Sequence, residues 1–140
     1  MRLAHTMIRV SNLERSIDFY TKTLGMDLLI SKDFPEGKYT IAFVGYGGEY
    51  DGALIELTHN WDTNSYDLGD GFGHIAIYTH DVCAICKKIE SHGGNIVRQP
   101  GPKKYGTTII AFATDPDGYK IEFVECEQEK AKKKAENKKW

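Results

Sequence analysis

The chain has 140 residues, a hydrophobic content of 41%, a charged content of 27% and a net charge of −2 at pH 7. This composition suits one compact unit or two small modules, and no apolar run approaches the ~20 residues that a membrane span needs. The small net charge argues against nucleic acid or an anionic membrane as a partner. The N-terminus, MRLAHTMIRV, is too interrupted for a signal peptide, so we expect a cytoplasmic protein.

The first half of the chain predicts a strand, a helix and three further strands. The strand covers 3–10, and the helix after it is capped either by Ser11, in a capping box with Glu14, or by Asn12. Gly25 suits the left-handed turn that ends such a helix. Three strand-like runs follow at 26–31, 38–46 and 53–59, and the turn compositions FPEG and GYGGEYDG separate them.

The second half repeats this order when His74 is aligned with His5. A strand begins at His74, Asp81 caps the following helix, and the Gly93–Gly94 pair ends it. The strand-like runs after this helix are at 95–99, 107–114 and 119–125, with turn compositions PGPKKYG and DPDG between them. We therefore predict an α+β fold of two tandem β-α-β-β-β modules, over 1–66 and 67–126, joined through the stretch 60–73.

The C-terminal segment, 127–140, has the sequence EQEKAKKKAENKKW. Its composition permits a helix, but it has no apolar stripe with which to pack against the rest of the protein. We therefore expect this Lys-rich tail to be frayed or disordered.

Cys83 and Cys86 form a C-x-x-C motif, which in some proteins performs redox chemistry. They also lie on a predicted helix in which Val82, Cys86 and Ile89 follow an apolar stripe. The stripe favours Cys86 as a small buried hydrophobic residue, and no second C-x-x-C completes a zinc ribbon.

Two glutamates interrupt apolar strands near the end of each half. Glu56 lies between Ile55 and Leu57, and Glu122 lies in the corresponding place in the second half. Ionised carboxylates are rarely buried without a partner, so two in matching settings suggest a shared reason. Each half carries one His on its first strand and one Glu on its last, and strand alternation puts these side chains on the concave face, away from the helix.

Two His and two Glu that converge on one point are suitable ligands for a divalent metal. Imidazole nitrogens and carboxylate oxygens both bind borderline cations, and two carboxylates balance a charge of 2+. Taken singly, a strand His is more often structural and each Glu could face solvent. The repetition favours the metal hypothesis for the set His5, Glu56, His74 and Glu122.

Several motifs resemble the compact bacterial form of the glyoxalase I (lactoylglutathione lyase) family, within the vicinal oxygen chelate superfamily. They are RLAHTMIRVSNLERSIDFYTKTLGM, YTIAFVGYG, ALIELTHNW, GHIAIYT and FATDPDGYKIE, and the resemblance covers residues 2–125. It implies a cytosolic homodimer with active sites at the subunit interface. It implies an enzyme that isomerises the hemithioacetal of methylglyoxal and glutathione to S-D-lactoylglutathione, thereby detoxifying methylglyoxal.

The resemblance also implies roles for the four candidate ligands. His5 and Glu56 of one chain would bind one divalent metal together with His74 and Glu122 of the other. Short forms with His in the first ligand position tend to use Ni²⁺ or Co²⁺, and Zn²⁺ is also possible. The metal acts as a Lewis acid that stabilises a cis-enediolate. Glu122 is implied as the base that moves the proton from C1 to C2, and Glu56 as the alternate base for the opposite stereoisomer.

The carboxylates of glutathione require cationic partners. Arg9 lies on the His5 face, about 13 Å along the strand, where its guanidinium could bind a carboxylate in bidentate fashion. By resemblance, Arg9 and Asn60 contact the glutathione moiety. Lys103 and Lys104 correspond more loosely to a mobile basic loop that closes over the substrate, and a solvated turn is an equally good interpretation of them.

Other interpretations remain open at the level of the sequence. One is another metal-dependent enzyme of the same superfamily, an epimerase or an extradiol dioxygenase, although a dioxygenase needs only one carboxylate and Glu56 would be surplus. A protein of a different class, a metal-free module that binds small molecules, would lack the ligand set. Metal content separates this last class from the enzymes.

Overall fold

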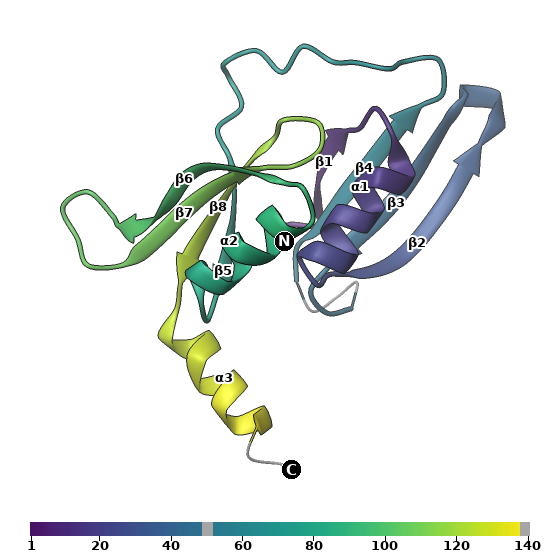
Figure 1. The fold of residues 1–140 in the computed structure, drawn as a ribbon. Coiled ribbons are helices and arrows are strands. Elements are labelled where there is room, and N and C mark those ends of the chain that lie inside the picture. The colour runs from purple at the N-terminus through teal and green to yellow at the C-terminus, as the bar shows by residue number, and fades with distance from the viewer. Residues whose placement is uncertain (49–51, 138–140) are drawn as a thin grey trace. The chain divides into compact units, whose positions relative to one another are not determined.

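The computed structural model describes residues 1–48 and 52–137. The chain divides into two compact units, Met1–Gly69 and Asp70–Trp140, and each contains one four-stranded sheet with a helix over one of its faces (Figure 1). This confirms the predicted α+β fold with a repeated β-α-β-β-β order. Two parts of the predicted segments, 49–51 in the turn GYGGEYDG and 138–140 in the tail, lie outside the described residues.

In the first unit the strand order is β1-β4-β3-β2. The first strand pairs in parallel with the last, and the other neighbours are antiparallel. The elements are β1 (His5–Arg9), α1 (Leu13–Asp18), a π-helical turn (Phe19–Thr23), β2 (Asp27–Phe34), a 3-10 turn (Pro35–Gly37), β3 (Tyr39–Gly45) and β4 (Leu54–Asn60).

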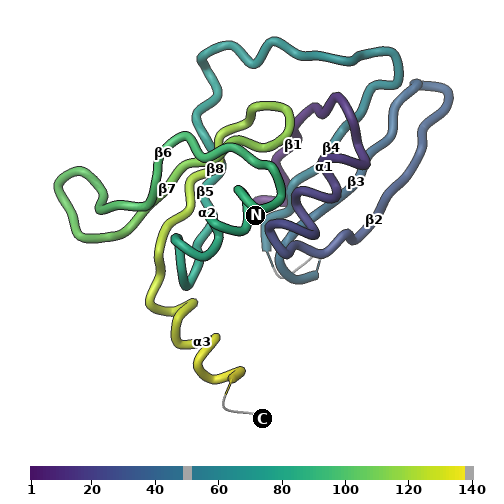
Figure 2. The backbone as a smooth tube through the Cα atoms, in the orientation of Figure 1, coloured from purple at the N-terminus to yellow at the C-terminus, as the bar shows by residue number. Residues whose placement is uncertain are grey.

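The second unit repeats this topology with the order β5-β8-β7-β6, in which β5 and β8 are parallel. Figure 2 shows β6 and β7 as an extended hairpin whose loop projects from the sheet. None of the helices in the described part of the chain is long and apolar enough to cross a membrane. The elements are β5 (Ile75–Thr79), α2 (Val82–Ser91), β6 (Asn95–Pro102), β7 (Ile109–Thr114), β8 (Lys120–Glu125) and α3 (Glu127–Asn137).

One face of each sheet is buried beneath its helix, and the hydrophobic core of each unit lies there. The burial of one such side chain, for example Leu57, contributes roughly 1.5–3 kcal/mol. The residues on this face alternate along each strand with those on the opposite, more open face, which carries the His and Glu side chains. The core includes Ile8, Tyr20, Ala42, Val44 and Leu57 in the first unit, and Ile77, Val82, Cys86, Ile89, Ala111, Ala113, Ile121 and Phe123 in the second.

The residues that cap the helix starts and the glycine that follows the first helix are largely those that the sequence predicts. Asn12 is the N-cap of α1, since its side chain accepts a hydrogen bond of 2.9 Å from the backbone N–H of Arg15. Ser11, the other candidate, instead accepts a hydrogen bond from the Arg15 guanidinium. Asp81 caps α2, as predicted. Gly25 has φ +78°, a left-handed conformation that favours glycine.

The Lys-rich tail differs from its predicted state, because residues 127–137 form helix α3. The helix has no buried residue, so ionic contacts take the place of an apolar stripe. Lys130 lies 2.8 Å from the carboxylate of Glu125 on β8 and 2.9 Å from that of Glu127. A further pair three residues apart, Lys132 with Glu129, supports the helix along its own surface. The contact to Glu125 fixes the start of α3 to the second sheet.

Candidate metal site

The first candidate pair lies on neighbouring parallel strands of the first unit. Met7 on β1 is opposite Glu56 on β4, so alternation along β1 places His5 on the same open face as Glu56. Nε2 of His5 is 2.9 Å from Oε2 of Glu56, and the Thr58 hydroxyl donates to Oε1 of the same carboxylate at 3.1 Å. The side chains of His5 and Glu56 are 39% and 18% exposed, which leaves them accessible to a ligand.

The second pair repeats this arrangement in the second unit. Ala76 on β5 is opposite Glu122 on β8, and His74 immediately precedes β5. Nε2 of His74 is 3.1 Å from Oε2 of Glu122, and the two side chains are 42% and 15% exposed. The predicted association of one His with one Glu in each half is therefore present in both units.

The chemistry of these pairs fits a divalent metal ion. Each presents one imidazole nitrogen and one carboxylate oxygen within hydrogen-bond distance of each other. Both atoms have lone pairs that a divalent cation could accept. In the part of the chain that the structure describes, no three His, Cys, Asp or Glu side chains form a group that could hold a metal. Each unit thus supplies one imidazole nitrogen and one carboxylate as donors.

Each histidine ring also contacts an aromatic ring that the sequence reasoning did not select. The His5 and Phe43 rings lie edge to face at 5.2 Å, and the His74 and Phe112 rings at 5.4 Å. Phe43 on β3 pairs with Glu56, and Phe112 on β7 pairs with Glu122. The repeat could have revealed both, because positions 43 and 112 are separated by 69 residues, as are 5 and 74.

The two residues predicted to contact glutathione lie in the first unit. Arg9 ends β1 opposite Thr58, on the open face, and is exposed. Asn60 ends β4, and its Nδ2 donates a hydrogen bond of 3.0 Å to the Tyr66 hydroxyl. Tyr66 was not among the predicted site residues, since it lies in the connecting stretch, where no strand periodicity indicates which way a side chain points.

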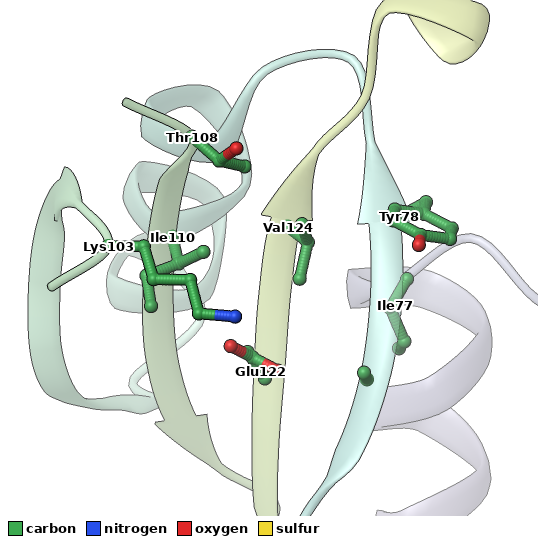
Figure 3. A pocket seen from close by; sticks show the side chains of 8 residues that line it. Ile77, Tyr78, Lys103, Thr108, Ile110, Glu122 and Val124 are labelled. Atoms are coloured by element: carbon green, nitrogen blue, oxygen red, sulfur yellow. The ribbon is translucent and has the colours of Figure 1, made fainter. Parts of the chain in front are cut away.

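The two lysines predicted to belong to a basic loop have different surroundings in the structure. Lys103 lines a pocket of about 340 Å³ on the open face of the second sheet, and Glu122 and Tyr78 are among the other lining residues. In Figure 3 the amino group of Lys103 points across this pocket toward the Glu122 carboxylate. Lys104 instead lies over the exposed ring of Tyr105, 5.0 Å from its centroid. Lys103 is therefore the better placed of the two to meet a ligand at Glu122.

Cys86 of the C-x-x-C motif is a buried core residue, as the apolar stripe on its helix predicts. Cys86 is 2% exposed in the core of the second unit, whereas Cys83 is exposed, and both are free thiols. Burial raises the pKa of the Cys86 thiol to about 11, with smaller contributions from Cys83 and Glu90. The buried thiol is consequently a poor nucleophile at neutral pH.

Comparison with known proteins identifies relatives over most of the chain. A sequence model described as the glyoxalase/bleomycin resistance protein/dioxygenase superfamily matches residues 2–123. A lactoylglutathione lyase of Neisseria meningitidis serogroup A is 60% identical over 125 residues, which cover 89% of this chain and 91% of that protein.

Solved structures give the same result. Glyoxalase I from Zea mays superposes with a TM-score of 0.87 and 48% identity over 89% of this chain. This chain spans only 44% of the maize chain. The trypanothione-dependent glyoxalase I of Leishmania major superposes with a TM-score of 0.81 and 41% identity, covering 99% of this chain and 96% of that one.

Proposed function

The chain belongs to the glyoxalase/bleomycin resistance protein/dioxygenase superfamily, and from this premise we propose that it is a lactoylglutathione lyase (EC 4.4.1.5). It would isomerise the hemithioacetal of methylglyoxal and glutathione to S-D-lactoylglutathione. The observation that carries the proposal is the repeated His–Glu pair, at 2.9 Å and 3.1 Å, in a chain 60% identical to a protein of that name.

The proposed metal site combines the two pairs. His5 and Glu56 of one chain bind one divalent ion together with His74 and Glu122 of a second copy, in a homodimer with two shared sites. Ni²⁺ is the proposed ion, Co²⁺ is the next candidate and Zn²⁺ is possible. When bound, the ion supplies Lewis-acid chemistry that stabilises negative charge on the substrate oxygens. The two modules would correspond to 1–66 and 67–126, with 127–140 as a tail, and the dimer would work in the cytoplasm.

The chemical step is a proton transfer within the substrate. Glu122 takes the proton from C1 of the hemithioacetal, which leaves the electron pair in an enediolate, and returns a proton to C2. The proton of the C1 hydroxyl passes to the oxygen on C2, so that C1 becomes the thioester carbonyl. No atom is gained or lost overall. The Glu122 side chain is partly exposed and lines the open pocket, where a substrate could approach it. Glu56 has the same setting in the other unit and is the proposed base for the opposite stereoisomer.

The charged ends of glutathione would be bound at a distance from the reacting carbons. Arg9 offers a guanidinium on the His5 face, and Asn60 offers amide groups at the end of the neighbouring strand. Lys103 projects into the pocket beside Glu122 and would neutralise negative charge there. Lys104 contacts Tyr105 and has the weaker geometric support of the two lysines.

An activity assay of metal-stripped protein tests the proposal most directly. The protein is supplied with Ni²⁺, Co²⁺, Zn²⁺ or Fe²⁺ in separate reactions with methylglyoxal and glutathione, and formation of the thioester is followed. We expect activity with Ni²⁺ and Co²⁺ and none in the stripped protein. Stoichiometric metal without isomerase activity favours an epimerase or dioxygenase instead. Failure of carefully prepared protein to bind any metal favours a small-molecule-binding protein.

A further inference from the structure

The two phenylalanines of the candidate metal site have closely similar positions in the two units. In the first sheet, the adjacent strands β1, β4 and β3 carry His5, Glu56 and Phe43. In the second sheet, Glu122 lies on β8 and Phe112 on β7, and His74 immediately precedes β5. The ring planes meet at 72° in one unit and 80° in the other, with centroids 5.2 Å and 5.4 Å apart. Such edge-to-face contacts contribute about 0.5–1.5 kcal/mol beyond their buried area.

These phenylalanines are not needed to fill the core. Phe43 and Phe112 are only half-buried and lie on the open face of their sheets. Their neighbours along the strands, Ala42 and Ala111, point to the opposite face and are fully buried beneath the helices. A large aromatic side chain on the open side of each sheet, in contact with a candidate ligand, therefore has a role other than core packing.

The hydrogen bond between each His and Glu can orient the imidazole only while a proton lies on Nε2. A metal that took the Nε2 and carboxylate lone pairs would take the place of that hydrogen bond. The contact with the phenylalanine lies between the two rings and does not use the nitrogen lone pair, so metal binding does not require its loss. Such a contact can limit rotation of the imidazole ring with or without metal.

We propose that Phe43 and Phe112 are positioning residues that hold the His5 and His74 rings in the orientation needed for metal binding, an inference that rests on the proposed metal-dependent function. An edge-to-face contact worth about 0.5–1.5 kcal/mol corresponds to about 2–10-fold in metal affinity. The two contacts belong to different units, so loss of either weakens the binding of the same ion.

Metal affinity measured without substrate tests the inference. The full-length protein is stripped of metal and titrated with Co²⁺ in competition with a chelating dye, and the visible absorption spectrum of bound Co²⁺ is recorded. Phe43→Leu and Phe112→Leu should each weaken Co²⁺ binding by about 2–10-fold and alter the spectrum. Phe43→Tyr keeps the aromatic ring and should restore binding. Thermal unfolding of each metal-free variant verifies its fold.

A matched control is available on the same strand and face. Ile41, two residues from Phe43, pairs with Thr58 and not with Glu56, so Ile41→Val trims a half-buried side chain away from the ligand pair. It should leave Co²⁺ affinity unchanged. If Phe43→Leu fails to fold, Phe112→Leu and Phe112→Tyr decide the question in the other unit.

The outcomes separate this inference from the proposed function. Folded leucine variants that bind Co²⁺ as tightly as the unaltered chain, with the same spectrum, would overturn the positioning role while the isomerase activity of the unaltered chain stood. An unaltered chain that binds no Co²⁺, Ni²⁺ or Zn²⁺ would overturn both. Weakened binding in the leucine variants with recovery in Phe43→Tyr supports the inference.

Discussion

Replacement of Glu122 by glutamine tests its proposed role as the base with little disturbance of the surrounding fold. The side chains have nearly the same shape, and Glu122 is 15% exposed on the open face, so glutamine fits without a clash or a cavity. The amide keeps a carbonyl oxygen toward Nε2 of His74, which is 3.1 Å from the carboxylate in the unaltered protein. What is lost is the negative charge, which also contributes to the proposed metal site, and the ability to accept a proton from carbon.

The structure gives very different magnitudes for stability and for activity. A charge-assisted hydrogen bond becomes a neutral one at a partly exposed site, which costs about 1 kcal/mol and lowers Tm by roughly 2–6 °C. Removal of a positioned general base lowers kcat by about 10²–10⁴-fold, equivalent to roughly 3–5 kcal/mol of transition-state stabilisation. A nearly inactive protein that unfolds within a few degrees of the parent is therefore expected.

The assay measures kcat and KM with Ni²⁺ in excess, and bound metal and Tm are determined on the same samples. Glu125→Gln is the matched control, because Glu125 lies on the same strand and its carboxylate contacts Lys130 at 2.8 Å, at the start of α3. The control should lose a little stability and keep its activity. Glu122→Gln protein with full metal content and kcat within a few-fold of the parent would refute the assignment of the base.

Three further predictions concern substrate binding, thiol chemistry and assembly. Arg9→Ala should raise KM for the hemithioacetal by about tenfold or more with a smaller change in kcat, because a charged hydrogen bond is lost; an unchanged KM contradicts the contact with glutathione. At pH 8 a thiol reagent should modify the exposed Cys83 and spare the buried Cys86. Burial raises the pKa of Cys86 to about 11, so between pH 9 and 11 the thiol ionises in the unfolded chain but not in the folded one. The free energy of unfolding should therefore fall as the pH rises through this range. Mass spectrometry of the labelled peptides and denaturation at several pH values check this, and equal labelling of the folded protein would show that Cys86 is accessible. Mixed His5→Ala and Glu122→Ala subunits should recover activity, because one of the two sites in a heterodimer is intact; no recovery after proven subunit exchange counts against sites shared between chains.

The duplication made much of the fold and the ligand pairs predictable. His5 and His74 align, and each is followed by a capped helix and three strands, so the second copy supports every assignment made in the first. The strand alternation that buries Leu57 and Phe123 necessarily turns Glu56 and Glu122 to the other face. Strand alternation and the internal repeat are both visible within a single sequence, which is why one chain was enough to recognise them.

Other features depended on contacts that no local pattern records. The choice of Asn12 over Ser11 as the cap depends on backbone angles within a single turn. The first turn of α3 is held by the contact between Lys130 and Glu125, two residues whose closeness in space depends on where β8 ends. Tyr66 meets Asn60 through an irregular segment. In each case the deciding partner is selected by three-dimensional position and not by periodicity.

The paired arrangement of His5, Glu56 and Phe43 with His74, Glu122 and Phe112 gives the molecule two independently mutable versions of one design. A change at position 43 alters the neighbourhood of one imidazole and leaves the other as an unmodified reference within the same polypeptide. Natural selection has the same freedom. Because both halves contribute to the proposed metal site, a change in either half can tune that site while the other half keeps its geometry.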